Sequence, residues 1–200
     1  MFLEQPNRLR FDVMTQVGPA LVLTSDGETF QLSDLREGTF LTGPTCPQNV
    51  ARVLGVSIRA DQVLRLLTGD TLTIDAIEQT MECRDGQYVV TLLGGDGSTQ
   101  EVAFSIQEGD HDKAPSDQRL NLRRSIERAP DGTKRWEATY DDYVEVDGRY
   151  FPTDVRFVDE REKAETAVRV KSIEIDPVIP EGAFHQEPAP GMTIDLADCS

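Results

Sequence analysis

The stretch ALVLTSDGETFQLS, Ala20 to Ser33, places two runs of alternating apolar and polar residues on either side of Asp26-Gly27. An Asp-Gly pair between alternating runs is a strong signal for a tight β-hairpin. The sequence therefore predicts antiparallel strands at 20–24 and 29–33. A tight apolar turn, QVGP at residues 16–19, precedes them.

The spacing of apolar residues changes after this hairpin, from every second residue to every third and fourth. Pro47 suits the first position of a helix, where its missing N–H would have no partner. Gly55 and Gly69 stand where two short helices should end. The pattern predicts two short helices between Pro47 and Thr68, the first ending at Gly55 and the second at Gly69. Their apolar stripes consist of Val50, Val53, Leu54, Val63, Leu64, Leu66 and Leu67.

The remaining segments indicate short strands separated by Gly-, Pro- and Asp-containing turns. The expected strands lie at residues 9–13, 40–41, 87–93, 100–106, 120–128, 136–140, 150–158 and 167–175. Residues 71–80 are weakly patterned and are expected to be partly loop, and residues 177–200 form an extended tail with several prolines. We predict a mainly β (α+β) fold, in which a curved antiparallel sheet forms an open or half β-barrel with a short helical lid.

Length and charge restrict the function. The chain has 200 residues, enough for one domain with a substantial core. Its 36 acidic and 20 basic residues give a net charge of −16, which disfavours nucleic acid as a partner and electrostatic attachment to anionic membranes. No apolar run has the length of a transmembrane helix, and the first residues do not form a signal peptide.

Four segments, taken in order, are similar to a known family: RLRFDV with TQVG (8–13 and 15–18), ARVLGV (51–56), LRLLTGD (64–70) and, more faintly, YFPTDVRF (150–157). Their order and spacing resemble the LolA/LolB group of periplasmic lipoprotein carriers, LolB more than LolA. The likeness covers roughly residues 5–70. It implies one domain over 1–200 that lacks the family's N-terminal helix and first strands. An uncovered sheet edge can pair with another chain, so we also expect an edge-mediated homodimer.

The resemblance further implies an incomplete barrel that shelters acyl chains beneath a helical lid, without catalysis or cofactors. The expected partners are lipidated proteins or lipid acyl chains, a periplasmic carrier and the outer membrane surface. Strand parity gives a candidate lining of Leu9, Phe11, Val13, Leu21, Leu23, Phe30, Leu32, Phe40, Trp136 and Tyr140. The candidate lid residues are Val50, Val53, Leu54, Val63, Leu66 and Leu67. The alternative interpretation of all these residues is a dry, packed core.

Val17 occupies the position at which the LolB resemblance implies a leucine at the tip of an exposed loop. There it would help to pass cargo into the membrane. One valine entering lipid contributes at most ~2 kcal/mol, enough to guide transfer but not to anchor the protein. The alternative is that Val17 packs against a neighbouring strand.

Three cysteines allow at most one disulfide within the chain. In a periplasmic compartment we expect Cys46 to pair with Cys199, because a C-terminal tail gains most from being tied down.

Other functions are weaker hypotheses. Cys46 before a helix N-terminus could be an activated nucleophile of a small hydrolase, with His111 or His185 as base. Asp110-His111-Asp112 could suggest a metal site, but adjacent residues cannot all point to one ion from a regular element, so no metal site is predicted. The main alternative to transfer is a structural or ligand-binding outer-membrane lipoprotein of the same fold.

Overall fold

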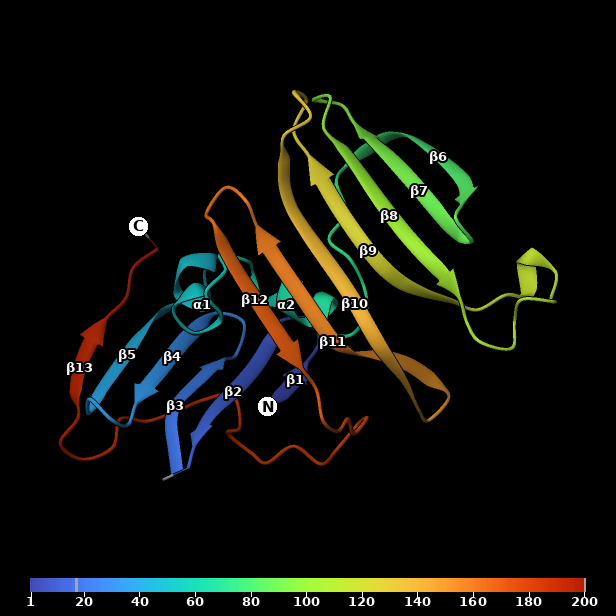
Figure 1. Cartoon of the computed structure of the whole chain (residues 1–200). Helices are drawn as coiled ribbons and strands as arrows, with labels where there is room; N and C mark the ends of the chain where they lie inside the picture. Colours follow the sequence, from blue (N-terminus) through green and yellow to red (C-terminus); the bar gives the residue numbers. More distant parts are fainter. Residues whose placement is uncertain (17, 200) are drawn as a thin grey trace. The chain divides into compact units, whose positions relative to one another are not determined.

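The computed structural model describes residues 1–16 and 18–199. The chain forms two compact units, one from Met1–Leu64 with Asp176–Ser200 and the other from Arg65–Ile175. Each unit contains one sheet (Figure 1). Apart from one parallel pair, the strands are antiparallel, and neither sheet closes into a barrel. The predicted mainly β, open architecture with short helices is therefore confirmed. The expectation of a single domain stays a prediction.

The first unit contains a six-stranded sheet in the order β1-β2-β3-β4-β5-β13. Its strands are β1 (Phe2–Glu4), β2 (Arg8–Thr15), β3 (Gly18–Ser25), β4 (Thr29–Asp34), β5 (Thr39–Pro44) and β13 (Thr193–Leu196). The predicted hairpin is β3–β4. Its turn is held by Asp26 Oδ1, which accepts hydrogen bonds from the backbone N–H groups of Glu28 and Thr29 at 2.9 and 2.8 Å. Gly27 adopts a φ of 102° in this turn, a conformation that glycine tolerates best.

The two predicted helices are α1 (Pro47–Leu54) and α2 (Ala60–Leu67). Pro47 begins α1, and Gly55 ends it in the left-handed conformation with φ 74°. Gly69, with φ 82°, follows the end of α2. The start of α1 and the ends of both helices therefore lie close to where the local signals place them. Among the described residues, no helix is long and apolar enough to cross a membrane.

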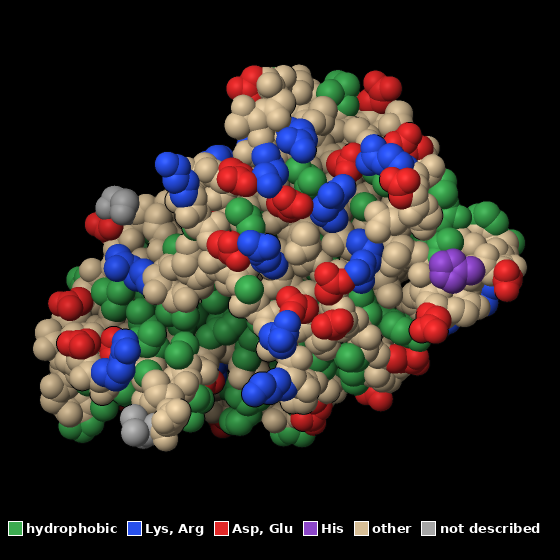
Figure 2. Space-filling view, viewed as in Figure 1, with side chains coloured by type: hydrophobic (Ala, Val, Ile, Leu, Met, Phe, Trp, Pro, Cys, Tyr) green, Lys and Arg blue, Asp and Glu red, His purple; other side chains and the backbone are tan. Residues whose placement is uncertain are grey.

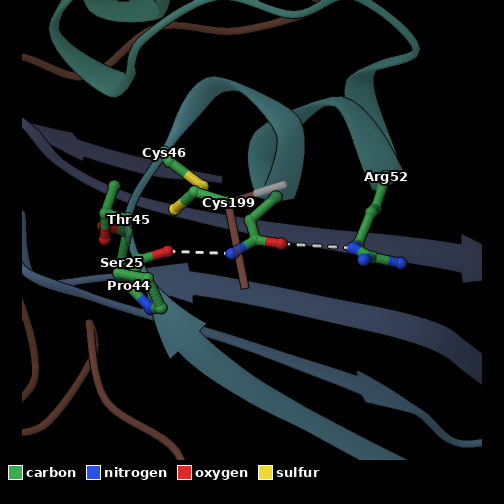
Figure 3. Close-up of a disulfide and its surroundings, with 7 residues drawn as sticks. Ser25, Pro44, Thr45, Cys46, Arg52 and Cys199 are labelled. Carbon is green, nitrogen blue, oxygen red and sulfur yellow. Dashed lines mark hydrogen bonds between the residues drawn. A yellow bond between two sulfur atoms is a disulfide. The ribbon is translucent and has the colours of Figure 1, made fainter. Parts of the chain in front are cut away.

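The N-terminus of α1 is fastened to the end of the chain. Cys46, the N-cap residue, forms a disulfide with Cys199, and their Cα atoms are 6.1 Å apart (Figure 3). Asn49 strengthens this corner, because its side-chain amide donates to the carbonyl of Pro44 at 2.9 Å and its oxygen accepts from Arg52 Nε at 3.2 Å. The disulfide is the pairing that the sequence analysis favours.

The tail between the disulfide and β13 runs close to β5. β13 pairs parallel to β5, and the N–H of Ala197 donates to the carbonyl of Thr42 at 2.8 Å. A Cβ atom at Gly43 would collide with the carbonyl group of Ala197. Glycine at this position is therefore required by the close approach of the C-terminal segment.

The second unit is a seven-stranded antiparallel meander with the order β12-β11-β10-β9-β8-β7-β6. Its strands are β6 (Ala76–Arg84), β7 (Gln87–Gly94), β8 (Thr99–Ile106), β9 (Leu120–Arg128), β10 (Lys134–Val146), β11 (Arg149–Asp159) and β12 (Ala164–Arg169), with a short 3-10 helix at Pro115–Asp117. Residues 71–75 are irregular, as expected for a segment that is partly loop, but β6 itself was not predicted. The strand expected at 167–175 lies at 164–169 instead.

One face of this second sheet is polar. Arg84 and Arg124 both pair with Glu101, at 2.7 and 3.1 Å, and Arg156 pairs with Glu165 at 2.7 Å. Figure 2 shows acidic and basic side chains interspersed over these strands. The alternation of sign is typical of a solvated sheet face and cross-strand pairs contribute modestly to its stability.

The opposite face carries the core of the second unit and is crossed by the segment that follows α2. Gln100, which is fully buried, donates to the carbonyl of Leu72 and to Ser125 Oγ, and accepts from the N–H of Ile74 at 3.0 Å. The Tyr140 hydroxyl donates to the carbonyl of Asp70 at 2.9 Å. One buried amide therefore holds the chain between α2 and β6 against the sheet.

We predict that Gln100→Leu destabilises the protein by about 2–5 kcal/mol. The substitution removes the hydrogen-bond partner of the Ile74 N–H and of the buried Ser125 hydroxyl, and leaves the Leu72 carbonyl with Thr71 Oγ1 alone. Each loss at a buried polar group costs ~1–3 kcal/mol. Urea unfolding of both proteins measures the difference. Gln48→Leu, at an exposed position of α1, is the matched control and should change stability much less.

We predict that Cys46→Ser lowers the free energy of unfolding by up to about 5 kcal/mol, because the disulfide closes a long loop. The same loss should follow from reducing the wild-type protein, and reductant should have no further effect on the variant. Cys83→Ser removes the free, exposed cysteine and is the control. Equal stability of wild type with and without reductant would contradict a stabilising role for this bond.

Candidate apolar binding surface

The six-stranded sheet has one apolar face. In the β2–β3 register, Leu9, Phe11 and Val13 lie opposite Ser25, Leu23 and Leu21. The register then continues this face through Phe30 and Leu32 on β4 to Leu41 on β5. We call this set the apolar face. All the lining residues predicted on these strands belong to it except Phe40.

Burial of the apolar face changes along its strands. Leu9, Leu23 and Phe30 are fully buried, and Ser25, at the same end, hydrogen-bonds to Thr45 just before α1. Phe11, Leu21 and Leu32 are only partly covered. Val13 keeps 39% of its surface exposed. The face is thus packed near the start of α1 and more accessible toward the β2–β3 turn.

Phe40 does not share the apolar face, which corrects the parity assignment. It lies opposite Ser33 in the β4–β5 register, so its side chain points to the other side of the sheet. Leu41 takes the expected place beside Leu32. A two-residue apolar segment does not fix parity from sequence, because either residue can point inward.

The other face of this sheet is covered by the chain's own C-terminal segment. Gln186 exchanges two hydrogen bonds with Gln31. The Gln31 side-chain amide donates to the backbone carbonyl of Gln186 at 2.9 Å, and the backbone N–H of Gln186 donates to Gln31 Oε1 at 2.7 Å. Ser33 donates to the Gln186 side chain at 2.7 Å. Arg10 donates to the carbonyl of Ala183, and Arg8 lies over the ring of Phe184 at 4.6 Å. This face combines polar side chains with the buried Val22 and Phe40, and the C-terminal segment occupies it.

The predicted lid residues differ in exposure. Val50 is completely buried, and Val63, Leu66 and Leu67 are also buried, whereas Val53 and Leu54 are partly covered. Figure 3 shows α1 lying above the strands of its sheet. The boundary between the two units falls within α2, after Leu64.

Trp136 and Tyr140 lie on β10, in the second sheet, and not on the sheet that carries the other lining residues. Trp136 stacks on Phe157 with ring centroids 5.7 Å apart and donates to Glu127 at 2.5 Å. Tyr140 is fully buried, and this burial raises the pKa of its hydroxyl well above the ordinary value. Their contacts are those of core residues in the second unit.

Sequence reasoning missed a second group of accessible apolar side chains. The inner face of the second sheet continues from its buried centre to Tyr88, Val90 and Phe104, which are partly covered, and to Met81 at the edge. Met81 is 69% exposed. The alternation of Ile77, Met81 and Cys83 with charged residues was the available signal, but it is interrupted by Gln79.

Val17 lies outside the described residues. On either side of it, Gln16 and Pro19 are exposed, and so is Met14, which keeps 65% of its surface accessible. The proposed role of Val17 therefore remains a prediction, made next to a turn whose described residues face solvent.

The residues considered for catalysis or metal binding have structural roles or are exposed. The Cys46 sulfur is bonded to Cys199, so it is not a thiolate nucleophile in this structure. Asp110 is buried and accepts hydrogen bonds from Arg119 Nε at 2.8 Å and from Lys113 at 2.7 Å. These cations lower the pKa of the Asp110 carboxyl well below its usual range. Asp110 thus holds the loop between β8 and β9 in place, while His111 and His185 are exposed.

Comparison with known proteins gives a result at the level of fold. No family model matches the chain, and no curated protein matches it. Among solved structures, the chain is similar to a LolA superfamily protein from Nitrosomonas europaea, with 12% identity and a TM-score of 0.50, over 92% of this chain and 79% of the other. An outer membrane lipoprotein-sorting protein domain from Vibrio parahaemolyticus is 9% identical, with a TM-score of 0.37, over 89% of this chain and 87% of that domain. The chain thus has a LolA-like fold, and at 12% identity the likeness establishes the fold alone.

Proposed function

We propose that this protein binds acyl chains of lipidated proteins or lipids without covalent chemistry and transfers them in the periplasm or at the outer membrane. The observation that carries this proposal is the apolar face of the first sheet, which is packed at one end and accessible at the other. We also propose that both units form one LolA/LolB-like domain, since the fold likeness covers 92% of the chain.

The apolar face suits a ligand that must be held and later released. Exposing an acyl chain to water costs ~0.8 kcal/mol per methylene, so a dozen methylenes amount to about 10 kcal/mol. Phe11, Leu21 and Leu32 offer apolar contact area without polar groups that would demand one geometry. The opposite face is filled by Gln186 and its partners, so the apolar face is the side of this sheet that we assign to cargo.

The disulfide supports an extracytoplasmic compartment, because such bonds persist in oxidising environments such as the periplasm. The net charge of −16 opposes binding to anionic surfaces. We therefore propose that transfer partners, a carrier or the outer membrane surface, are engaged mainly through apolar contacts. LolB-like delivery into the membrane, with Val17 at its tip, is the specific form that we propose.

We predict that Leu21→Gln weakens binding of a fluorescent fatty-acid probe by about tenfold or more. Burial of one leucine side chain contributes about 1.5–3 kcal/mol, and 1.4 kcal/mol corresponds to a factor of ten. The matched control is Leu196→Gln on β13, which is exposed and points to the other face, and its affinity should equal that of wild type. Wild-type protein that does not bind the probe would favour a packed core and a structural role.

We predict that Val17→Glu leaves probe affinity unchanged but slows delivery of bound cargo to liposomes. A carboxylate at the tip makes entry into the lipid interface unfavourable, whereas the apolar face is not altered. Transfer of a labelled lipopeptide to vesicles measures the rate, and Val17→Leu is the control that should preserve it. An unchanged rate for Val17→Glu would remove this residue from the mechanism.

A further inference from the structure

Among the described residues, the outer edge of β6 is the longest sheet edge that no strand covers. β6 ends the seven-stranded sheet, and among the described residues no strand pairs with its outer side (Figure 1). All nine of its residues, Ala76 to Arg84, are exposed. β1 and β13 are edges of three and four residues. Such an edge offers a row of free backbone N–H and C=O groups to another strand.

The other edge of the same sheet differs in its side chains. On β12 the exposed residues are Glu165, Ala167 and Arg169, and two of them are charged. Charges on an edge strand oppose pairing with another chain. On β6, by contrast, Ile77 and Met81 are 74% and 69% exposed. Met81 lies opposite Val90, and Val90 lies opposite Val102, so an apolar row on the inner face runs out to this edge without a cover.

We propose that two copies of this chain pair antiparallel through β6, with Met81 on the twofold axis. The charged residues of β6 favour a second copy of the same strand as the partner, and they favour one alignment of the two strands. In this arrangement Glu78 lies opposite Arg84 of the second copy, and the reciprocal pair forms across the axis. Opposite charges in directly facing positions stabilise an antiparallel pair, and like charges destabilise it.

The neighbouring registers that keep the inner faces on one side either bring like charges together, form no ion pair or shorten the contact. An axis at Gln79 places Glu78 opposite Thr80 and Glu82 opposite Ala76, so no ion pair forms. Moving the axis to Thr80 places Glu78 opposite Glu82 of the second copy, twice. Moving it to Glu82 places that residue opposite itself. An axis at Cys83 restores a Glu82–Arg84 pair but leaves only residues 82–84 of the strand in contact. The Met81 register therefore combines residues 78–84 with complementary charge.

The ion pairs of the single chain are compatible with this pairing. Arg84 already contacts Glu101 at 2.7 Å and Glu82 at 3.4 Å. Glu78 makes no ion pair within the described part of the chain, so it would gain its partner only in the dimer. The facing Met81 side chains join the apolar row of one copy to that of the other, which makes the inner face continuous across the interface.

The experiment is cysteine cross-linking in a Cys83→Ser background, with mild oxidation and non-reducing electrophoresis. Met81→Cys should form a covalent dimer, because the two introduced thiols face each other across the axis. Ala167→Cys, on the opposite edge of the same sheet, is the matched control and should remain monomeric. Gln79→Cys with Cys83 retained should also cross-link, since residues 79 and 83 of opposite copies face each other in this register.

Sedimentation measures the dimer without cross-linking. Met81→Asp places two carboxylates on the axis and should weaken self-association at least tenfold, whereas Ala167→Asp should leave it unchanged. Circular dichroism confirms that both variants are folded. A monomer at every concentration, cross-linking through Ala167→Cys, or dimers joined by native Cys83 but not by Met81→Cys would overturn the proposal. Failure here leaves the apolar-face proposal intact, because the two surfaces lie on different sheets.

Discussion

The hydrogen bonds between Gln186 and the strands β3 and β4 are the constraint on which the first unit depends. They place a polar side chain from the C-terminal segment among Gln31, Ser33 and Thr24, which would otherwise be buried polar groups in need of partners. One face of the six-stranded sheet is thereby closed by a fixed polar network. The other face must satisfy its side chains by apolar packing, and that packing is incomplete toward the β2–β3 turn.

The disulfide and β13 extend this constraint to the helices. Cys199 holds the N-terminus of α1, and β13 adds a parallel strand beyond β5. The same C-terminal segment thus closes one face of the sheet, completes one of its edges and fixes the start of the helix associated with the apolar face. α1 is therefore fixed at its start by the disulfide, and the buried Val50 and Val56 hold its middle and the residue that follows its end.

The hairpin and both helices were predictable because their signals are local. Asp26-Gly27 fixes a turn, and Pro47, Gly55 and Gly69 mark helix ends whatever packs around them. The residues of the apolar face could also be predicted, because alternate residues of a strand share one side of the sheet and these strands have several apolar residues. The assignment of Phe40 to the apolar face was wrong because a short strand with two adjacent apolar residues does not show which of them points inward. Trp136 and Tyr140 were read correctly as inward-facing, but parity within one strand does not say to which sheet that strand belongs. β6 was missed as a regular strand because an edge exposed on both sides imposes little alternation on its sequence.

The treatment of sheet edges connects these observations. β1 and β13 limit exposure by being short, and β12 does so with charged side chains. β6 is long, and its inner side continues an apolar row that is buried at Val102 and accessible at Met81. An edge of this kind is a liability in a single chain at high concentration unless its pairing is specified. The arrangement of Glu78, Glu82 and Arg84 supplies such a specification. Like charges face each other in several registers, and of the two registers that pair opposite charges the one centred on Met81 has the longer contact. In the proposed dimer, charge on β6 therefore acts differently from charge on β12: it does not block pairing but favours one extended geometry.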